Sequence, residues 1–222
     1  MSVEKIHLRK LLQLFYANTR LQRSLLLRDI REDRRKASRG GKGGGDFFSP
    51  FWADVKAHAA GLVDIRASTA ERIAANKRRR RLYLALSESF LSMWAEKMRW
   101  RNEAFEFVPE SIKARLPIPE LSSVVKIENT VGVRIWDGSY RVIYPYFCEA
   151  PALPEEGVRL AFWVLSEALP NYRPNDFRIV DLQHRAYFRP SDIERHGDEQ
   201  MEFLRKYESL LKAWRKLRDD GK

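Results

Sequence analysis

Two runs rich in β-branched and aromatic residues, with an Asp-Gly pair between them, restrict the fold of this chain more than any other feature. The runs are VVKIENTVGVRIW at residues 124–136 and YRVIYPYF at residues 140–147, and Asp137 and Gly138 lie between them. Such side chains favour strands, and the glycine of an Asp-Gly pair supplies the positive φ that a tight hairpin turn requires. The sequence therefore predicts a β-hairpin in the carboxy-terminal half.

Helical and strand patterns continue beyond this hairpin. A helix is expected over residues 154–170, a strand over residues 177–189, and a closing helix over residues 197–222. The closing helix keeps one apolar face, formed by Phe203, Tyr207, Leu210, Trp214 and Leu217. We therefore expect a module at residues 121–222 with a small sheet, in the order strand, strand, helix, strand, helix.

The amino-terminal region reads as helix. Residues 3–36 contain neither proline nor glycine, and leucines recur at intervals of three and four, so residues 1–38 are predicted to form one long amphipathic helix. Two alternatives stay open for it: a helix that packs on its own domain, or a helix that forms a homodimer or binds a protein partner. The second depends on a heptad-like spacing of Leu11, Leu14, Leu21 and Leu25, with Asn18 at an inner position.

A glycine-rich segment, RGGKGGGD at residues 39–46, follows this helix. It is predicted to be a flexible linker, with contact to nucleic acid as the alternative. Residues 47–120 are predicted to be a basic helical region in which Ser49, Pro50 and Gly61 mark the ends of a first helix. Its aromatic residues are expected to anchor it to the core, and its last part, with three prolines, reads as a connection. The whole chain is thus predicted to be α+β.

The charge is distributed unevenly along the chain. Residues 1–50 hold 12 Lys and Arg against 5 Asp and Glu, residues 51–120 hold 13 against 9, and residues 121–222 hold 16 against 16. All of the net charge of +11 therefore lies in the first 120 residues. Basic segments attract polyanions and supply phosphate contacts that do not depend on sequence.

Five consecutive cations, Lys77–Arg81, are the most concentrated part of this charge. Ser68 and Glu71 have capping-box spacing, so a helix is expected to begin just before the run, with a break at Asn76. If the break is real, the cations lie near a helix start, where the macrodipole disfavours positive charge. Phosphate contact is the leading interpretation, and a solvated collar or an intramolecular acidic patch are the alternatives.

The predicted nucleic-acid-binding residues combine this run with basic residues of the first helix and the linker. They are Lys77, Arg78, Arg79, Arg80, Arg81, Arg34, Arg35, Lys36, Arg39 and Lys42.

The pattern VGVRIWDGSYRVIYPYF, followed by a helix and a strand, resembles the core of the PD-(D/E)XK nuclease family found at the end of RecB-type proteins. The resemblance covers roughly residues 121–190 and places Gly132 at the family's glycine. Arg134 or Ile135 stands at the family's aspartate, and Tyr144 and Tyr146 stand at its acid and lysine. Metal-dependent phosphodiester cleavage needs those carboxylates, so the resemblance implies an inactive relative that retains the fold.

Other chemistry-bearing residues follow no established spacing. His184 and His196, near Asp181, Asp192 and Glu194, are expected to be solvated rather than a metal or acid–base site. Cys148 is a weak candidate nucleophile, and a lone cysteine indicates a reducing compartment. We therefore predict no catalytic residue, metal or cofactor.

These observations favour a cytoplasmic, non-enzymatic protein that binds nucleic acid or assists a nucleic-acid-binding partner, with no membrane contact. The main alternative is a protein–protein adaptor or an inhibitor or immunity-type partner that docks through its amphipathic helices. An unrecognised hydrolase is the third possibility.

Overall fold

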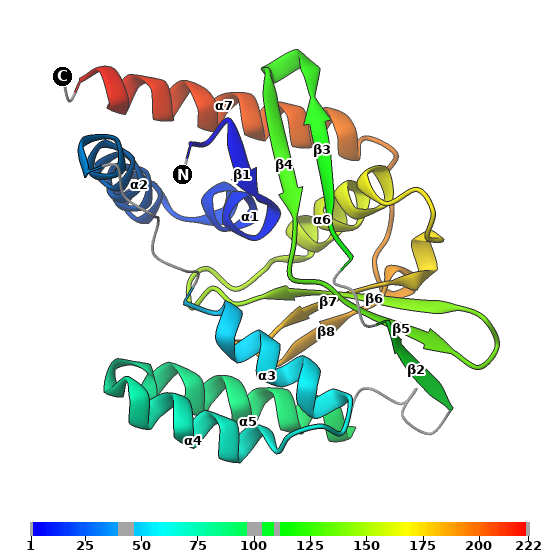
Figure 1. Ribbon diagram of the computed structural model, residues 1–222. Coiled ribbons are helices and arrows are strands. Elements are labelled where there is room, and N and C mark those ends of the chain that lie inside the picture. Colours follow the sequence, from blue (N-terminus) through cyan, green and yellow to red (C-terminus); the bar gives the residue numbers. More distant parts are fainter. Residues whose placement is uncertain (1, 40–46, 97–103, 109–111, 221–222) are drawn as a thin grey trace.

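The structure, a computed structural model, describes residues 2–39, 47–96, 104–108 and 112–220, apart from the side chains of residues 36, 38, 39 and 96. Within these residues the chain folds into helices and two β-sheets (Figure 1). The predicted α+β class is confirmed, although the sheets contain more strands than the sequence indicated.

The larger sheet has the strand order β2-β5-β6-β7-β8. Its strands are β2 (Phe105–Val108), β5 (Val131–Ile135), β6 (Tyr140–Tyr146), β7 (Phe177–Asp181) and β8 (Ala186–Phe188). The β5–β6 hairpin is the predicted one, with Gly138 at φ 82° in its turn. Helix α6 (Glu155–Ala168), also predicted, connects β6 to β7. Strands β6 and β7 are parallel. The other neighbouring strands are antiparallel.

The smaller sheet joins the amino terminus to the middle of the chain. Its order is β1-β4-β3, with β1 (Lys5–His7) parallel to β4 (Ser123–Ile127) and β3 (Ala114–Ile118) antiparallel to it. The sequence predicts residues 47–120 to be helical and to end in a proline-containing connection. This prediction is wrong for the last part, which contains strands β2 and β3. Pro117 is tolerated because β3 is an edge strand, where a missing N–H breaks no ladder bond on its outer side.

Two predicted strands are each divided in two. The run at residues 124–136 contains β4 and β5, which belong to different sheets, and Asn129 turns the chain between them with φ 64°. The run at residues 177–189 contains β7 and β8, which form a hairpin with Arg185 at φ 53°. Neither Asn129 nor Arg185 is a glycine, so no glycine in the sequence indicated these two turns.

The prediction of one helix at residues 1–38 is wrong. Strand β1 is followed by α1 (Leu8–Tyr16) and α2 (Thr19–Arg39). Ala17 is extended, and the Asn18 side chain accepts a hydrogen bond from the backbone N–H of Leu21 at 2.9 Å. Asn18 therefore caps a helix rather than occupying the inside of a coiled coil. The heptad-like leucines pack against the chain's own core, which favours the intramolecular alternative.

The basic helical region begins with α3 (Ser49–Ala59), α4 (Ile65–Ala75) and α5 (Arg80–Glu96). The predicted capping box at Ser68 and Glu71 is wrong, because α4 starts earlier. Its N-cap is Asp64, whose carboxylate accepts hydrogen bonds from the backbone N–H groups of Arg66 at 2.6 Å and Ala67 at 3.3 Å. The aromatic anchor is confirmed for Phe51 and Trp52, which are buried.

The five-stranded sheet separates two hydrophobic cores. On one face, α3, α4 and α5 pack against Val133, Ile135 and Val180. On the other face, α6 packs against Val142 and Ile179, and α1, α2 and α7 (Glu199–Asp219) extend this core beyond α6 (Figure 1). The predicted apolar face of α7 is buried throughout. None of the helices in the described residues combines the length and apolar character needed to cross a bilayer.

Candidate nucleic-acid interface

The basic run Lys77–Arg81 comprises the connection between α4 and α5 and the first two residues of α5. Asn76 ends α4 with extended backbone angles, and its side chain accepts a hydrogen bond from the backbone N–H of Arg78 at 3.1 Å. Residues Lys77–Arg79 then make a single 3₁₀ turn before α5 begins at Arg80. The predicted break is confirmed, so the cations surround the positive end of the α5 dipole and raise the local potential together with it.

The five side chains of the run have different environments. Arg79 is half-buried, with its guanidinium 5.4 Å from the centre of the Tyr83 ring. Arg81 is 81% exposed and forms a 2.6 Å ion pair with Glu149, which is 49% exposed, so the pair adds little stability. The remaining three cations, Lys77, Arg78 and Arg80, are exposed, and no hydrogen bond or ion pair joins their side chains to another described residue.

The connection is held on a packed layer. The Tyr83 hydroxyl donates a hydrogen bond to the backbone carbonyl of Phe47 at 2.7 Å. Phe48 stacks on Phe147 at a centroid distance of 4.9 Å, which fixes the start of α3 on the sheet. The two nitrogens of Arg72 bind the two carboxylate oxygens of Asp54 at 3.0 and 2.9 Å, which ties α4 to α3. The exposed cations therefore project from a well-fixed turn.

The other predicted binding residues lie on a different layer. Arg34 and Arg35 have exposed side chains on α2, which belongs to the core on the opposite face of the sheet. Arg34 donates a hydrogen bond to the backbone carbonyl of Arg218 in α7 at 3.1 Å. The side chains of Lys36 and Arg39, and Lys42 as a whole, lie outside the described residues. The described members of the predicted set are thus divided between two layers.

Asp181 and His184 form a close pair at the end of β7, and the expectation that Asp181 is solvated is wrong, because its carboxylate is buried. Asp181 is 1% exposed, and its carboxylate accepts hydrogen bonds from the backbone N–H groups of Leu153, Gln183 and His184, each at 3.2 Å. Nδ1 of His184 adds a fourth at 2.9 Å. Since protein donors surround this carboxylate, its evident role is to fasten the turn after β7 to the segment before α6.

The remaining histidine and acids of the sequence candidates lie elsewhere. His196 contacts Arg159, and Asp192 forms an ion pair with Arg189 at 2.8 Å. No group of three or more His, Cys, Asp or Glu side chains within the described ranges is arranged to hold a metal ion.

Burial makes the thiol of Cys148 a weaker acid than an exposed cysteine. It raises the pKa of the thiol to about 11, against the smaller opposing effects of Arg9 and of a hydrogen bond with Tyr146. A thiol with this pKa carries almost no thiolate at neutral pH, and the thiolate is the nucleophile. The structure therefore gives no support to Cys148 as a catalytic residue.

The positions that carried the nuclease-like resemblance have structural contacts. Gly132 lies in β5, where an added Cβ would come within 2.9 Å of Val108 Cβ. The Tyr144 hydroxyl accepts a hydrogen bond from the backbone N–H of Arg9 at 2.7 Å, and the Tyr146 hydroxyl donates one to the backbone carbonyl of Pro151 at 2.9 Å. These contacts explain why the residues are there but do not test the family relationship, which stays a prediction.

An ionic network between α6 and α7 escaped the sequence analysis. Arg159 binds Glu202 at 2.6 Å and lies 3.7 Å from Glu199, while Lys206 binds Glu156 at 2.8 Å. A hydrogen bond with Glu156, and then burial, raise the pKa of Glu202. Burial opposes ionisation of Glu156 as well, but hydrogen bonds with Glu202 and Lys206 lower its pKa. Because Arg159 and Glu202 are 43 residues apart in sequence, local spacing gave no signal of the pairing.

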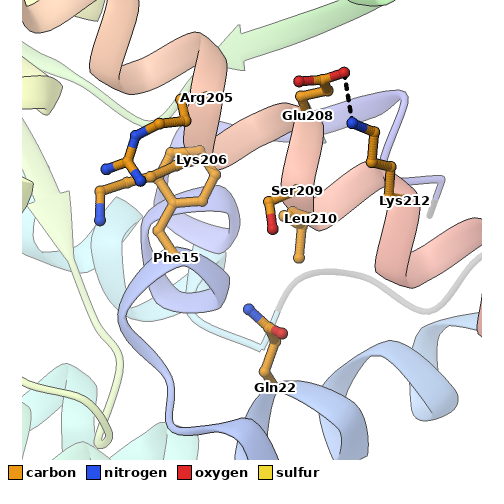
Figure 2. Close-up of a pocket in the computed structure, with 8 residues that line it drawn as sticks. All are labelled: Phe15, Gln22, Arg205, Lys206, Glu208, Ser209, Leu210 and Lys212. Carbon is orange, nitrogen blue, oxygen red and sulfur yellow. Dashed lines mark ion pairs between the residues drawn. The ribbon is translucent and has the colours of Figure 1, made fainter.

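Lys206 also borders a groove between α7 and the first two helices (Figure 2). The groove has a volume of about 390 Å³ and is lined by Phe15, Gln22, Arg205, Lys206, Glu208, Ser209, Leu210 and Lys212. Lys206 is held by Glu156 at 2.8 Å, and Lys212 by Glu208 at 2.8 Å. Gln22 donates to the backbone carbonyl of Leu14 at 2.8 Å. Because Arg205, Lys206 and Lys212 each have a carboxylate within 3.9 Å, the groove has no counterpart of the cations Lys77, Arg78 and Arg80, which no other described residue pairs.

Comparisons with known proteins give no further constraint. No protein-family model, no curated protein and no solved structure matches this chain. The arguments about function therefore depend on the residues themselves.

Proposed function

We propose that this protein binds nucleic acid, or assists a nucleic-acid-binding partner, without catalysis, by contacting phosphates through its basic helical region. The observation that carries the proposal is the exposure of Lys77, Arg78 and Arg80 at the α4–α5 connection, without a partner among the described residues. Such cations on a fixed turn can bind phosphates with little ordering cost, and they release the counterions condensed on nucleic acid.

The contribution of the other predicted residues is part of the same proposal. Arg81 can exchange its exposed ion pair with Glu149 for a phosphate at small cost. Arg79 supports the turn through Tyr83. The basic residues of α2 and the linker (Arg34, Arg35, Lys36, Arg39 and Lys42) would enlarge the positive field rather than extend the same contact surface. A reducing, cytoplasmic setting belongs to the proposal as well.

The test is fluorescence anisotropy with labelled single-stranded and duplex DNA and RNA at several salt concentrations. The test variant carries Lys77→Ala, Arg78→Ala and Arg80→Ala. We expect its affinity to fall for all sequences, and the slope of log affinity against log salt for duplex DNA to flatten by about 2 to 3, since each lost phosphate contact contributes about 0.9.

A matched control removes the same charge elsewhere. Arg205→Ala, Lys212→Ala and Arg215→Ala remove three cations from α7, all at least 48% exposed. An equal loss of affinity in both variants would show an effect of net charge alone and would refute the assignment to the α4–α5 connection. Absence of binding by the unmodified protein at low salt would refute the proposed function and would favour a protein partner.

A further inference from the structure

Trp136 is the most exposed of the large apolar side chains in the described residues, at 87% exposure. It follows β5 directly and begins the β5–β6 turn. Its backbone N–H donates a hydrogen bond to the backbone carbonyl of Ala104 at 3.0 Å, so the backbone at this position is fixed beside β2. An indole held in solvent on a fixed backbone leaves apolar surface in contact with water and adds no burial to the fold, which is typical of residues that bind a partner.

Strand alternation sets the face on which this side chain lies. Ile135 faces the core formed with α3, α4 and α5, so Arg134 and Trp136, its neighbours on either side, belong to the opposite face. Arg134 pairs across the sheet with Glu106 on β2 and with Tyr140 on β6. Farther along β6 the same face is buried under α6, but Arg134, Glu106 and Trp136 are exposed. The hairpin end of the sheet is therefore an uncovered stretch of sheet face.

Aromatic and cationic groups gather at this end. Tyr140 contacts Tyr172 edge to face at 5.4 Å between ring centres, and both are half-buried. A hollow of about 350 Å³ lies beside the indole, lined by Ala104, Phe105, Glu106, Arg134, Ile135 and Trp136. Arg173 lies close enough to contribute, together with Arg141, to the lowering of the pKa of Asp137, after the larger effect of hydrogen bonds from Ser139.

We infer that this hairpin platform, defined as Arg134, Trp136 and Tyr140, stacks an unpaired base of a single-stranded nucleic acid. Bases stack on exposed aromatic rings of sheet faces, and stacking tolerates any base. Arg134 offers a cation to the adjoining phosphate. Two acids lie nearby, Glu106 opposite Arg134 on β2 and Asp137 directly after Trp136, and both disfavour a phosphate beside them. The platform therefore receives the base, and the phosphate contacts Arg134 from the side of β6, away from Glu106. A duplex presents no unstacked base and gains nothing here.

This inference rests on the proposed function and adds to it a preference for single-stranded over duplex nucleic acid. Glu149, which pairs with Arg81, lies beyond one end of β6, whereas Trp136 lies at the other. Seven residues of strand span roughly 23 Å, so the two contacts are distinct and can be removed separately.

The experiment compares the full-length protein with Trp136→Ala and Trp136→Phe, using a labelled oligothymidylate and a duplex, each of about 20 nucleotides or base pairs. Met201→Ala on α7, another exposed apolar side chain, is the matched control. We expect Trp136→Ala to weaken oligothymidylate binding roughly tenfold and to leave duplex binding within about twofold. Trp136→Phe should retain most of the affinity, but lose the quenching of tryptophan emission that the bound oligonucleotide causes in the unmodified protein.

The outcomes separate the two proposals. Unchanged oligothymidylate affinity in Trp136→Ala would overturn the hairpin platform. Binding that still depends on Lys77, Arg78 and Arg80 would leave the proposed function intact. Equal losses for single strand and duplex would also overturn the hairpin platform, because stacking cannot act on a closed duplex. No binding of either probe by the unmodified protein would remove both proposals.

Discussion

On one face of the five-stranded sheet, Arg159 of α6 and Lys206 of α7 are held against carboxylates of the same two helices. On the other face, the α4–α5 connection leaves Lys77, Arg78 and Arg80 in solvent. Arg159 illustrates the first arrangement: its side chain is 11% exposed, and it contacts Glu199, Glu202 and His196. Arginine and lysine are thus paired with carboxylates in one region and exposed to solvent in the other.

The difference separates charges that stabilise the fold from exposed charges that no other described residue pairs. A buried charge must be paired, because water no longer solvates it, whereas an exposed charge can remain unpaired at little cost. The layer of α6 and α7 can therefore be neutral overall and still depend on its ion pairs. The basic layer, formed by α3, α4 and α5, can lose exposed cations without unfolding. Each of the following substitutions tests one side of this contrast.

The largest effect is expected for Arg159→Met. The variant keeps much of the side-chain volume but leaves Glu199 and Glu202 without their common partner, so the free energy of unfolding should fall by about 2–4 kcal/mol. Urea denaturation measures this. Lys212→Ala, which removes an exposed pair on the same helix, is the control and should change it by less than about 0.5 kcal/mol. A small effect of Arg159→Met would mean that the network does not stabilise this layer.

The ionisation of Glu199 should make the free energy of unfolding depend on pH. Burial opposes its ionisation, but the backbone N–H groups of His196 and Gly197, at 2.7 and 3.2 Å, and the nearby Arg159 hold its pKa below the ordinary value. A carboxyl with a depressed folded-state pKa stabilises the fold above its unfolded pKa of about 4.3, and this contribution is lost as pH falls through the folded value.

Glu199→Gln removes that titration. At pH 7 it should cost about 1–2 kcal/mol of unfolding free energy, and the difference from the unmodified protein should shrink below about pH 4. Urea titrations between neutral and acidic pH measure both quantities. A difference that stays constant with pH would show that ionisation of Glu199 is not the cause.

A smaller effect is expected for Tyr83→Phe, which tests how the basic layer is held. The substitution removes the hydrogen bond to the carbonyl of Phe47 but keeps the ring under Arg79, so it should cost about 1 kcal/mol. Thermal unfolding followed by circular dichroism checks it. A loss as large as that for Arg159→Met would show that this single hydrogen bond, rather than the packing of the Tyr83 ring, holds this part of the fold.

The smallest effect is expected for the joint replacement of Lys77, Arg78 and Arg80 by alanine. Because these side chains are exposed and surround the positive end of the α5 dipole, the unfolding free energy should change by less than about 0.5 kcal/mol, with either sign. Urea denaturation of the variant prepared for the binding experiment gives the answer. A marked destabilisation would place these cations among the structural charges.

The candidate nucleic-acid interface could be located from the sequence only in part. The run of five cations and the break at Asn76 were legible, because capping residues and charge runs act locally. Which members of the run are exposed was not, since Arg79 turns inward only because Tyr83 lies one helical turn away on a buried face. The hairpin platform was also missed: Trp136 looked like the end of an ordinary strand, and its exposure depends on where α6 stops covering the sheet.

The sequence by itself determined the α+β class, the β5–β6 hairpin, and helices α6 and α7, because turn residues and apolar periodicity are local signals. It also determined the concentration of charge in the first 120 residues. Only the tertiary structure decided that β1 pairs with β4, that residues 124–136 contribute to two different sheets, and that α6 and α7 share an ionic network. Each of these joins segments far apart in the chain, so the packing of the folded protein, rather than any local propensity, selects it.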